Sequence, residues 1–112
     1  MKTITRERLQ ELIERNAVVL LEALPPMHFS AEHLPGARNL PLDDLDEVAA
    51  VVAPDKAATV VTYCTGTTCA NSKIAAGRLE ALGYTDVRAY EGGKEEWIAA
   101  GLAVEATSAR AT

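Results

Sequence analysis

Residues 59–90 read TVVTYCTGTTCANSKIAAGRLEALGYTDVRAY, and this stretch decides the fold. It opens within a β-branched and apolar run, 58–63, that predicts a buried strand. A polar loop follows, and a helix is then predicted from about residue 70 to residue 82, where Gly83 ends it. DVRAY (86–90) is the next predicted strand. A strand, a helix and a second strand in this order are typical of a parallel sheet.

The sequence before this stretch predicts the same alternation. Thr5 is a suitable N-cap for a helix over 6–15, in which apolar residues recur at helical spacing. The continuous apolar run AVVLLEAL (17–24) has the length and composition of a central strand that is covered on both faces. Pro25 and Pro26 end this strand, because proline cannot donate a hydrogen bond to a neighbouring strand.

Shorter elements are predicted between that strand and the one at 58–63. The segment 28–37 has the pattern of a loop with one helical turn, and RNLPL (38–42) that of a short extended piece. Asp43 is expected to cap a further helix, which Pro54 closes. The alternation of helices and short strands therefore predicts an α/β fold with a central parallel sheet and helices on both faces.

The C-terminal part predicts one more helix and a tail. Gly92 and Gly93 open a short helix that carries Trp97. Residues 105–112 lack bulky apolar side chains and are expected to form a disordered tail. With 112 residues and no internal repeat, the chain is expected to fold as a single domain over 1–104.

The charge and hydropathy patterns argue against several classes of partner. The formal net charge is -5 at pH 7 and no basic stripe is present, so nucleic acid is not an expected partner. No apolar run approaches the length of a membrane span, and the charged N-terminus has no apolar core of signal-peptide length. We therefore expect no membrane partner and a cytoplasmic location. In that reducing compartment, two cysteines are expected to serve chemistry rather than a disulfide framework.

Both cysteines, Cys64 and Cys69, lie in the polar loop after the predicted strand. In parallel α/β sheets ligands bind beyond the carboxyl ends of the strands, and Cys64 lies at such an end. A loop rich in Gly and Thr before a helix suits an anion, because its backbone N–H groups point inward. Ionising most of a thiol of pKa about 8.5 at pH 7 needs roughly 2.7 kcal/mol, which two or three amide hydrogen bonds supply. The sequence therefore predicts a Cys64 thiolate that the loop stabilises.

Each cysteine also has a simpler interpretation. Cys64 would then be a small apolar residue buried at a strand end, an interpretation that its place in the loop disfavours. Cys69, at the first turn of the next helix, has three open roles. It packs behind the loop, attacks Cys64 as a resolving thiol, or contacts a substrate.

Over nearly its full length, the chain also resembles the rhodanese-like sulfurtransferase family. HLPGARNLPLDDL (33–45) is similar to the family's His-Ile-Pro-Gly-Ala-x-Asn-Ile-Pro segment. VVTYC (60–64), with the loop after it and AAGRLEALGYTDVRAYEGGKEEWIAAGLAV (75–104), resembles the family's active-site half. The resemblance implies a rhodanese-like fold, with a parallel sheet of about five strands, and transfer of a sulfane sulfur through a cysteine persulfide.

The resemblance also implies roles for individual residues. Cys64 matches the catalytic nucleophile. The loop that holds the outer sulfur is matched by Thr65, Gly66, Thr67, Thr68, Cys69 and Ala70. The element that packs beside the site is matched by Gly92, Gly93 and Trp97. The family's chemistry implies a small sulfur donor, an acceptor that is cyanide, a small thiol or a protein thiol, and no cofactor.

The chain departs from the family pattern at two places. The common loop is Cys-x-x-Gly-x-Arg, whereas Gly66 is here the third residue and Cys69 stands where arginine is frequent. The loop therefore lacks a cation for a dianionic donor such as thiosulfate. Glu22 and Leu24 replace an Asp and an Arg at the end of the first long strand, so the family's ion pair is expected to be absent there. The cations that could replace the missing clamp are Arg38, Lys73, Arg78 and Lys94.

The histidines and the acidic run have structural interpretations. His33 matches a family histidine and is expected to be a hydrogen-bonding strut rather than a catalytic base. His28 belongs to no motif, and two histidines without a carboxylate at ligand spacing predict no zinc site. The acidic residues at the start of the helix after Pro41 are expected to complement the helix dipole as solvated surface; they are Asp43, Asp44, Asp46 and Glu47.

Three functions are compatible with a reactive cysteine in this setting. The favoured one is a sulfurtransferase that moves sulfur through a Cys64 persulfide. A phosphatase of related fold would need a Cys-x5-Arg loop, and Ala70 stands at the arginine position. The alternative that stays open is a redox or reactive-sulfur sensing or binding module with a reversible Cys64–Cys69 disulfide.

Overall fold

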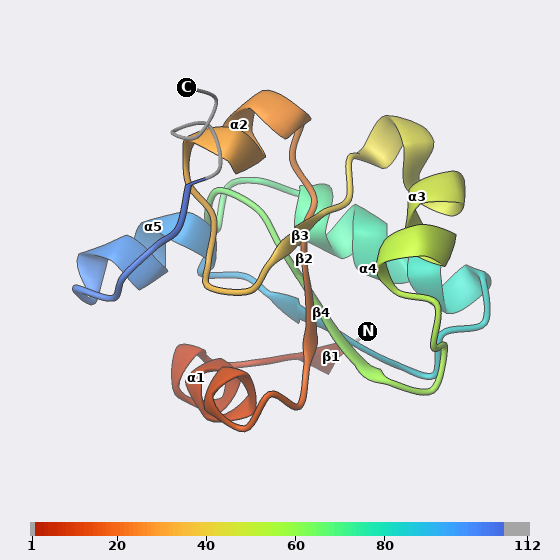
Figure 1. The fold of residues 1–112 in the computed structure, drawn as a ribbon, viewed down its shortest axis with the longest axis horizontal. Helices are drawn as coiled ribbons and strands as arrows, with labels where there is room; N and C mark the ends of the chain where they lie inside the picture. Colours follow the sequence, from red (N-terminus) through yellow and green to blue (C-terminus); the bar gives the residue numbers. More distant parts are fainter. Residues whose placement is uncertain (1, 107–112) are drawn as a thin grey trace.

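The computed structural model describes residues 2–106 and contains one five-stranded parallel sheet (Figure 1). The strand order is β1-β5-β4-β2-β3, and every neighbouring pair is parallel. The strands are β1 (Lys2–Thr3), β2 (Val19–Glu22), β3 (Arg38–Asn39), β4 (Thr59–Tyr63) and β5 (Asp86–Tyr90). The helices are α1 (Arg6–Glu14), α2 (Pro26–Ala31), α3 (Leu45–Val52), α4 (Asn71–Ala81) and α5 (Gly93–Ala99), with a 3₁₀ turn, η1, at Leu42–Asp44. The predicted fold class is confirmed.

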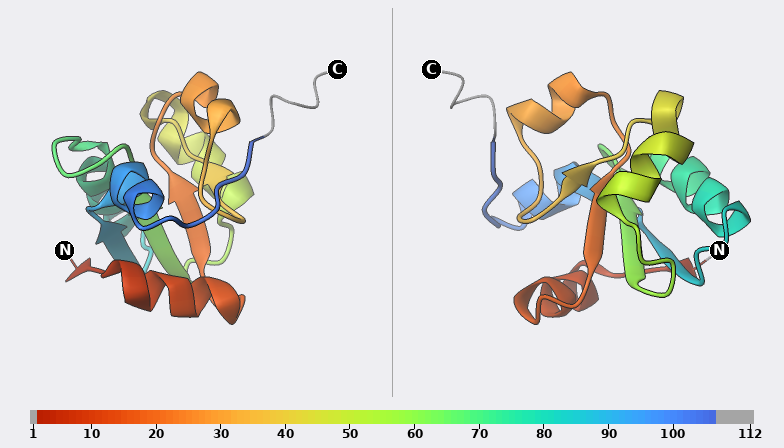
Figure 2. Two further views of the ribbon diagram at one scale, coloured as in Figure 1. Left: turned by 90° about the vertical axis from the view of Figure 1, so that its left-hand side faces the viewer. Right: turned by 45° about the vertical axis from the view of Figure 1, so that its right-hand side comes forward.

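Helices cover both faces of the sheet, as the two views of Figure 2 show. Successive side chains of a strand point to opposite faces, so each central strand contributes to two cores. On β4, Val60 packs in the core beneath α3 and α4, whereas Val61 and Tyr63 pack in the core beneath α1 and α5. The second core includes Trp97 of α5. A strand buried on both faces explains why β4 has no alternation of buried and exposed residues; its fully buried threonine, Thr62, donates to the Ser72 carbonyl at 2.8 Å.

Two predicted helix boundaries have the expected local contacts: the start of α1 and the end of α4. Thr5 caps α1, and its Oγ1 accepts a hydrogen bond from the Arg8 N–H at 3.2 Å. After α4, Gly83 takes a φ of 102°, which favours glycine. The Tyr84 N–H then reaches the Leu79 carbonyl at 3.1 Å, which closes a Schellman motif.

Three details differ from the sequence predictions. Asp43 lies inside η1 and caps no helix, because Pro41 starts a tight 3₁₀ turn and α3 then begins without a side-chain cap. The helical turn expected in 28–37 begins earlier, at Pro26, where the missing N–H costs nothing. Strand β1 was not predicted, because two residues carry no readable period.

The C-terminal segment is held to the domain as far as the structure describes it. Glu105 and His33 exchange two backbone hydrogen bonds of 2.8 Å in an isolated antiparallel bridge. Glu105 therefore belongs to the folded part and not to the predicted disordered tail of 105–112. Residues 107–112 of that predicted tail lie outside the described residues. Within 2–106, no helix has the length and apolar composition needed to cross a membrane.

Candidate active site

Cys64 is the first residue after β4, at the carboxyl edge of the sheet, and only 1% of its surface is exposed. The loop that follows joins β4 to α4 and runs to Ala70 (Figure 1). β4 lies between β5 and β2 in the strand order, so Cys64 emerges near the middle of the sheet. The sequence predicted this position, which is where parallel sheets bind ligands.

Helix α5 holds the first two residues of this loop. The backbone N–H groups of Lys94 and Glu95 donate to the carbonyl oxygens of Cys64 and Thr65 at 3.0 and 2.9 Å. Gly93 makes this approach possible: it has a φ of 61°, and a Cβ at this position would lie 2.5 Å from the Cys64 carbonyl oxygen. Gly93 therefore allows α5 to fix the backbone of the candidate nucleophile.

The loop curls so that its two cysteines meet. The Cys69 N–H donates to the Gly66 carbonyl at 3.1 Å, which forms a tight turn. The Cys64 thiol in turn donates to the Cys69 carbonyl, with 3.3 Å between Sγ and oxygen. Both cysteines are free thiols. The structure thus brings together the ends of the predicted loop, Cys64 and Cys69.

The surroundings of Cys64 oppose its ionisation. Burial raises the pKa of the Cys64 thiol, and its contact with Cys69 raises this pKa further. Hydrogen bonds from Ser72 act in the opposite direction but do not compensate. This direction runs against the predicted Cys64 thiolate, because the prediction assigned loop amides to the sulfur without the cost of desolvating it.

Cys69 is the more acidic member of the pair. Its partial burial raises the pKa, but hydrogen bonds from Cys64 and from the backbone of Asn71 and Thr65 outweigh that effect, and the pKa is lowered. Asn71 is the first residue of α4, where unpaired N–H groups favour negative charge. The opposite directions of the two pKa shifts make Cys69 the thiol that ionises first.

The four cations that could have replaced a loop arginine are all engaged elsewhere. Lys73 pairs with Glu91 at 3.0 Å, and Arg78 pairs with Asp46 at 3.2 Å. The two remaining cations, Arg38 and Lys94, donate to the carbonyl oxygens of Val52 and His28, respectively. Each of these four side chains therefore has a partner elsewhere in the domain.

A buried ion pair lies behind the site. Lys94 Nζ lies 3.0 Å from Glu22 Oε2, and the two side chains are 9% and 0% exposed. Glu22 Oε1 also accepts a hydrogen bond of 2.8 Å from the hydroxyl of Tyr63, the residue before Cys64. Burial raises the pKa of Glu22, although Tyr63 and Lys94 lower it in part. The family's Asp–Arg pair is absent as expected, but Glu22 makes a different ion pair that the sequence did not indicate.

His33 is a strut, as predicted. Its Nδ1 lies 2.9 Å from the Phe29 carbonyl oxygen, and its ring stacks on that of Phe29 with 4.0 Å between centroids. Its Nε2 lies 3.6 Å from Glu105 Oε1. The side chain therefore ties α2 to the C-terminal segment and does not reach the cysteine loop. Among residues 2–106, no three His, Cys, Asp or Glu side chains are arranged to hold a metal ion.

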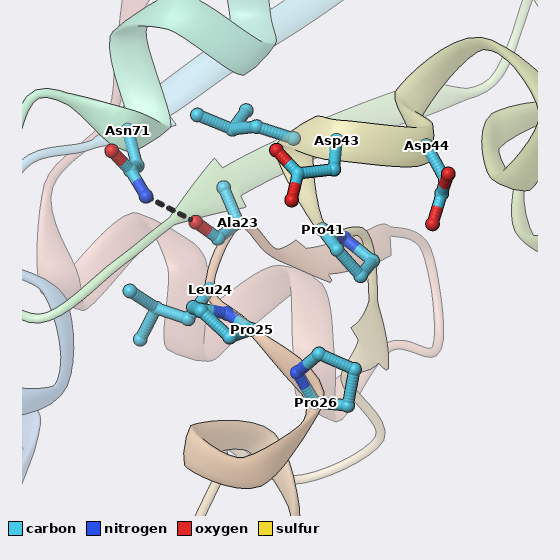
Figure 3. Close-up of a pocket in the computed structure, with 9 residues that line it drawn as sticks. Ala23, Leu24, Pro25, Pro26, Pro41, Asp43, Asp44 and Asn71 are labelled. Carbon is cyan, nitrogen blue, oxygen red and sulfur yellow. Dashed lines mark hydrogen bonds between the residues drawn. The ribbon is translucent and has the colours of Figure 1, made fainter.

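Three surface cavities border the cysteine loop region. The first, of about 250 Å³, is shown in Figure 3 and lies between the prolines after β2, the acidic start of η1 and Asn71 of α4. Asn71 Nδ2 donates to the Ala23 carbonyl at its rim at 2.9 Å (Figure 3). The second, of about 220 Å³, lies between α2 and α5 and is lined by Thr65 and Glu95. The third, of about 420 Å³, lies between the N-terminal segment and the start of α5 and is lined by Thr67 and Arg6. The second and the third each include a residue of the cysteine loop, so both are candidates for a substrate path.

Sequence reasoning named Lys94 only as a possible cationic clamp and missed its buried pair with Glu22. It also missed Tyr63 and Glu95, whose contacts depend on long-range packing. A lysine in the first turn of a short helix carries no local signal of burial, and Glu22 lies 72 residues away in sequence. Glu95 extends its carboxylate over Gly66, which only the tertiary arrangement of α5 and the loop reveals.

Two curated proteins are similar to this chain in sequence. Among curated proteins, the HTH-type transcriptional regulator Rv0324 of Mycobacterium tuberculosis is 32% identical over 102 residues, which are 91% of this chain and 44% of that protein. The uncharacterized protein slr1261 of Synechocystis is 34% identical over 100 residues, which are 89% of this chain and 54% of that protein. The chain therefore spans about half the length of the curated relatives it matches.

A solved enzyme structure shares the fold of this chain, and a family model matches its sequence. The thiosulfate sulfurtransferase from Pseudomonas aeruginosa has a TM-score of 0.84 at 26% identity, with 96% of this chain and 20% of that chain covered. The model of the rhodanese-like domain matches residues 5–100, a range that runs from the cap of α1 to the end of α5 and includes the whole cysteine loop. By this match, the chain belongs to the rhodanese-like domain family.

Proposed function

We propose that this chain is a sulfurtransferase in which Cys64 accepts a sulfane sulfur, holds it as a persulfide and passes it to a thiophilic acceptor. The observation that carries the proposal is the position of Cys64. It is the first residue after the central strand β4, and α5 fixes its backbone at the carboxyl ends of the strands. Family membership supports the reaction class, and a structural relative is by name a thiosulfate sulfurtransferase.

The proposed reaction has two displacement steps. In loading, the Cys64 thiolate attacks the sulfane sulfur of the donor, and the bond between that sulfur and the rest of the donor breaks. The rest leaves with the electron pair, as a thiolate from a persulfide or as sulfite from thiosulfate. In unloading, cyanide, a small thiol or a protein thiol attacks the outer sulfur, and the Cys64 thiolate leaves. No oxidant, reductant or cofactor is consumed.

The residues of the loop have proposed roles in these steps. Backbone N–H groups of Thr65, Gly66, Thr67, Thr68 and Ala70 would hold the outer sulfur, since a persulfide carries negative charge that amides stabilise. The Cys69 N–H, which donates to the Gly66 carbonyl, would keep the loop curled around it. Because burial raises the pKa of the Cys64 thiol, its proton must leave before it attacks. Loading is therefore expected to speed up as the pH rises towards the pKa of Cys64.

A turnover assay tests this proposal. Polysulfide or thiosulfate serves as donor and cyanide as acceptor, and thiocyanate is measured. Cys64→Ser is nearly isosteric, so it is expected to keep the fold and to lose at least ~10³-fold in turnover. A folded Cys64→Ser protein with a substantial fraction of wild-type turnover would remove Cys64 from the nucleophile's role.

A second candidate function rests on the contact between the two thiols. The Cys64 thiol bonds the Cys69 carbonyl, and Cys69 has a lowered pKa, so Cys69 is able to attack Cys64 when Cys64 carries a leaving group. Such a module would sense oxidants or reactive sulfur through a reversible Cys64–Cys69 disulfide. Its test is the appearance, under mild peroxide, of a monomer lighter by two hydrogens that dithiothreitol reverses.

A further inference from the structure

Glu95 of α5 lies against the cysteine loop. Its backbone N–H donates to the Thr65 carbonyl, and its side chain turns back over Gly66. If residue 66 had a Cβ, Glu95 Oε1 would overlap it, with the Glu95 Cδ at 2.8 Å and Cγ at 3.4 Å. A carboxylate therefore covers the backbone two residues after Cys64, in a place that only a glycine leaves free.

The charge of this carboxylate is not neutralised by the part of the chain that the structure describes. Within residues 2–106, no lysine, arginine or histidine lies within ion-pair distance of Glu95. The preceding residue, Lys94, points into the buried pair with Glu22. Glu95 also lines the cavity that reaches Thr65, together with a second acid, Glu32, and with Lys94, which is already paired with Glu22. An anion that enters this cavity therefore meets two carboxylates without a cationic partner in the described part of the chain and one lysine whose charge is balanced.

We propose that Glu95 is a specificity-determining residue that disfavours anionic sulfur donors at Cys64 and favours donors whose sulfur-bearing end is neutral or cationic. This inference rests on the proposed sulfurtransferase function and names its donor class. Thiosulfate carries two negative charges and is disfavoured most. A persulfide flanked by an ammonium group is favoured, because Coulomb attraction by one exposed carboxylate acts over a few ångströms despite screening.

A charge-selectivity experiment tests this role without requiring turnover. In a Cys69→Ala background Cys64 is the only thiol of the chain. It is treated with methanethiosulfonates that carry either a sulfonate or a trimethylammonium group. The Cys64 thiolate attacks the sulfenyl sulfur, methanesulfinate leaves with the electron pair, and a mixed disulfide forms. The ratio of the two rate constants, divided by the same ratio for 2-mercaptoethanol, reports the local charge and cancels any change in the pKa of Cys64.

Glu95→Gln is expected to lower the preference for the cationic reagent about fivefold, and Glu95→Lys is expected to reverse it. Raising the ionic strength should reduce the preference in the parent protein and have little effect in Glu95→Gln. The matched control is Glu80→Gln, which removes the same charge from the last turn of α4, about 14 Å along the helix from its loop end. This control should leave the ratio unchanged.

The donor arm compares thiosulfate with cysteamine persulfide in loading Cys64, with the extra sulfur measured by intact mass. Glu95→Gln is expected to raise the rate with thiosulfate relative to cysteamine persulfide by about fivefold or more. An unchanged reagent ratio in Glu95→Gln, with sulfur still loaded, overturns the role of Glu95 and leaves the proposed function intact. A shifted ratio with no sulfur loaded from either donor overturns the proposed function, and with it the role of Glu95 in donor choice.

Discussion

The Cys64 thiol donates a hydrogen bond to the backbone carbonyl of Cys69, with 3.3 Å between the sulfur and the oxygen. This bond favours the neutral thiol, because a thiolate has no proton to donate. The buried cysteine is therefore stored in its protonated form, and the more exposed Cys69 ionises first. Cys69 therefore limits the reactivity of Cys64, because its contact raises the pKa of the Cys64 thiol. A change that removes this contact should make Cys64 easier to ionise.

Replacing the Cys69 side chain should shift the pH dependence of Cys64. Cys69→Ala keeps the backbone carbonyl that accepts the thiol hydrogen bond, but it removes the side chain, whose contact and charge also raise the pKa of Cys64, so that pKa is expected to fall relative to wild type. Thiolate reactivity falls about tenfold per pH unit below the pKa, so the alkylation profile of Cys64 should move to lower pH. Iodoacetamide rates over a pH series, read for the Cys64 peptide by mass spectrometry, measure the shift. Superimposable profiles would show that Cys69 does not influence Cys64.

The same substitution should lengthen the life of a Cys64 persulfide. In wild type, the Cys69 thiolate is able to attack the inner sulfur, which releases hydrosulfide and leaves a Cys64–Cys69 disulfide. Closing that bridge would sacrifice the loop hydrogen bonds, each worth about 1.5–3 kcal/mol when an anion accepts, so the attack should be slower than transfer to a good acceptor. Cys69→Ala is therefore expected to keep the first sulfur transfer and to form no disulfide. Equal persulfide lifetimes in both proteins would leave Cys69 a packing residue.

Gly93→Ala should destabilise the fold and misplace the cysteine loop. The added Cβ would lie 2.5 Å from the Cys64 carbonyl oxygen and 2.8 Å from the Thr65 carbonyl carbon, and the φ of 61° strains any other residue. The expected loss in the free energy of unfolding is about 2–4 kcal/mol. Gly77→Ala in α4 is the control, because no heavy atom lies within 4 Å of its added Cβ and alanine favours helix by about 0.5–1 kcal/mol. Urea denaturation of the two variants should move in opposite directions.

Removing only Lys94 from the buried Lys94–Glu22 pair should destabilise the fold more than removing both charges. Lys94→Met leaves the Glu22 carboxylate buried without its partner, at an expected cost of about 3–5 kcal/mol. The double variant Glu22→Gln, Lys94→Met should recover much of this loss. Burial raises the pKa of Glu22, so Lys94→Met should be least destabilised below the unfolded carboxyl pKa of about 4.3 and should lose stability as the pH rises above it. A loss that is independent of pH and unrepaired in the double variant would contradict this role of the ion pair.

The elements that could be predicted from sequence are those with local causes. The apolar run of β4, the glycine that closes α4 and the threonine that caps α1 act within a few residues, and each appears where it was expected. β1 was missed because its two residues are a strand only through pairing with β5. The start of α3 was misjudged because Pro41 bends the chain into a 3₁₀ turn before the acidic residues.

The candidate site was predictable in position but not in electrostatics. The place of Cys64 follows from the order of strand, loop and helix, which is a local pattern. Its protonation depends on burial by distant segments and on how closely Cys69 approaches, and neither quantity is encoded in spacing. The same holds for Lys94 and Glu95: one turns inward to Glu22 and the other turns over Gly66, although they are neighbours in the chain.

The most direct test of sulfur transfer through Cys64 is the intact mass of the protein after exposure to polysulfide and desalting. Wild type and Cys69→Ala are expected to gain one sulfur atom that cyanide removes with formation of thiocyanate, and Cys64→Ser is expected to gain none. Proteolytic mapping should place the extra sulfur on the peptide that contains Cys64. A wild-type protein that gains no sulfur, or a Cys64→Ser protein that gains as much as wild type, would contradict the proposed persulfide chemistry.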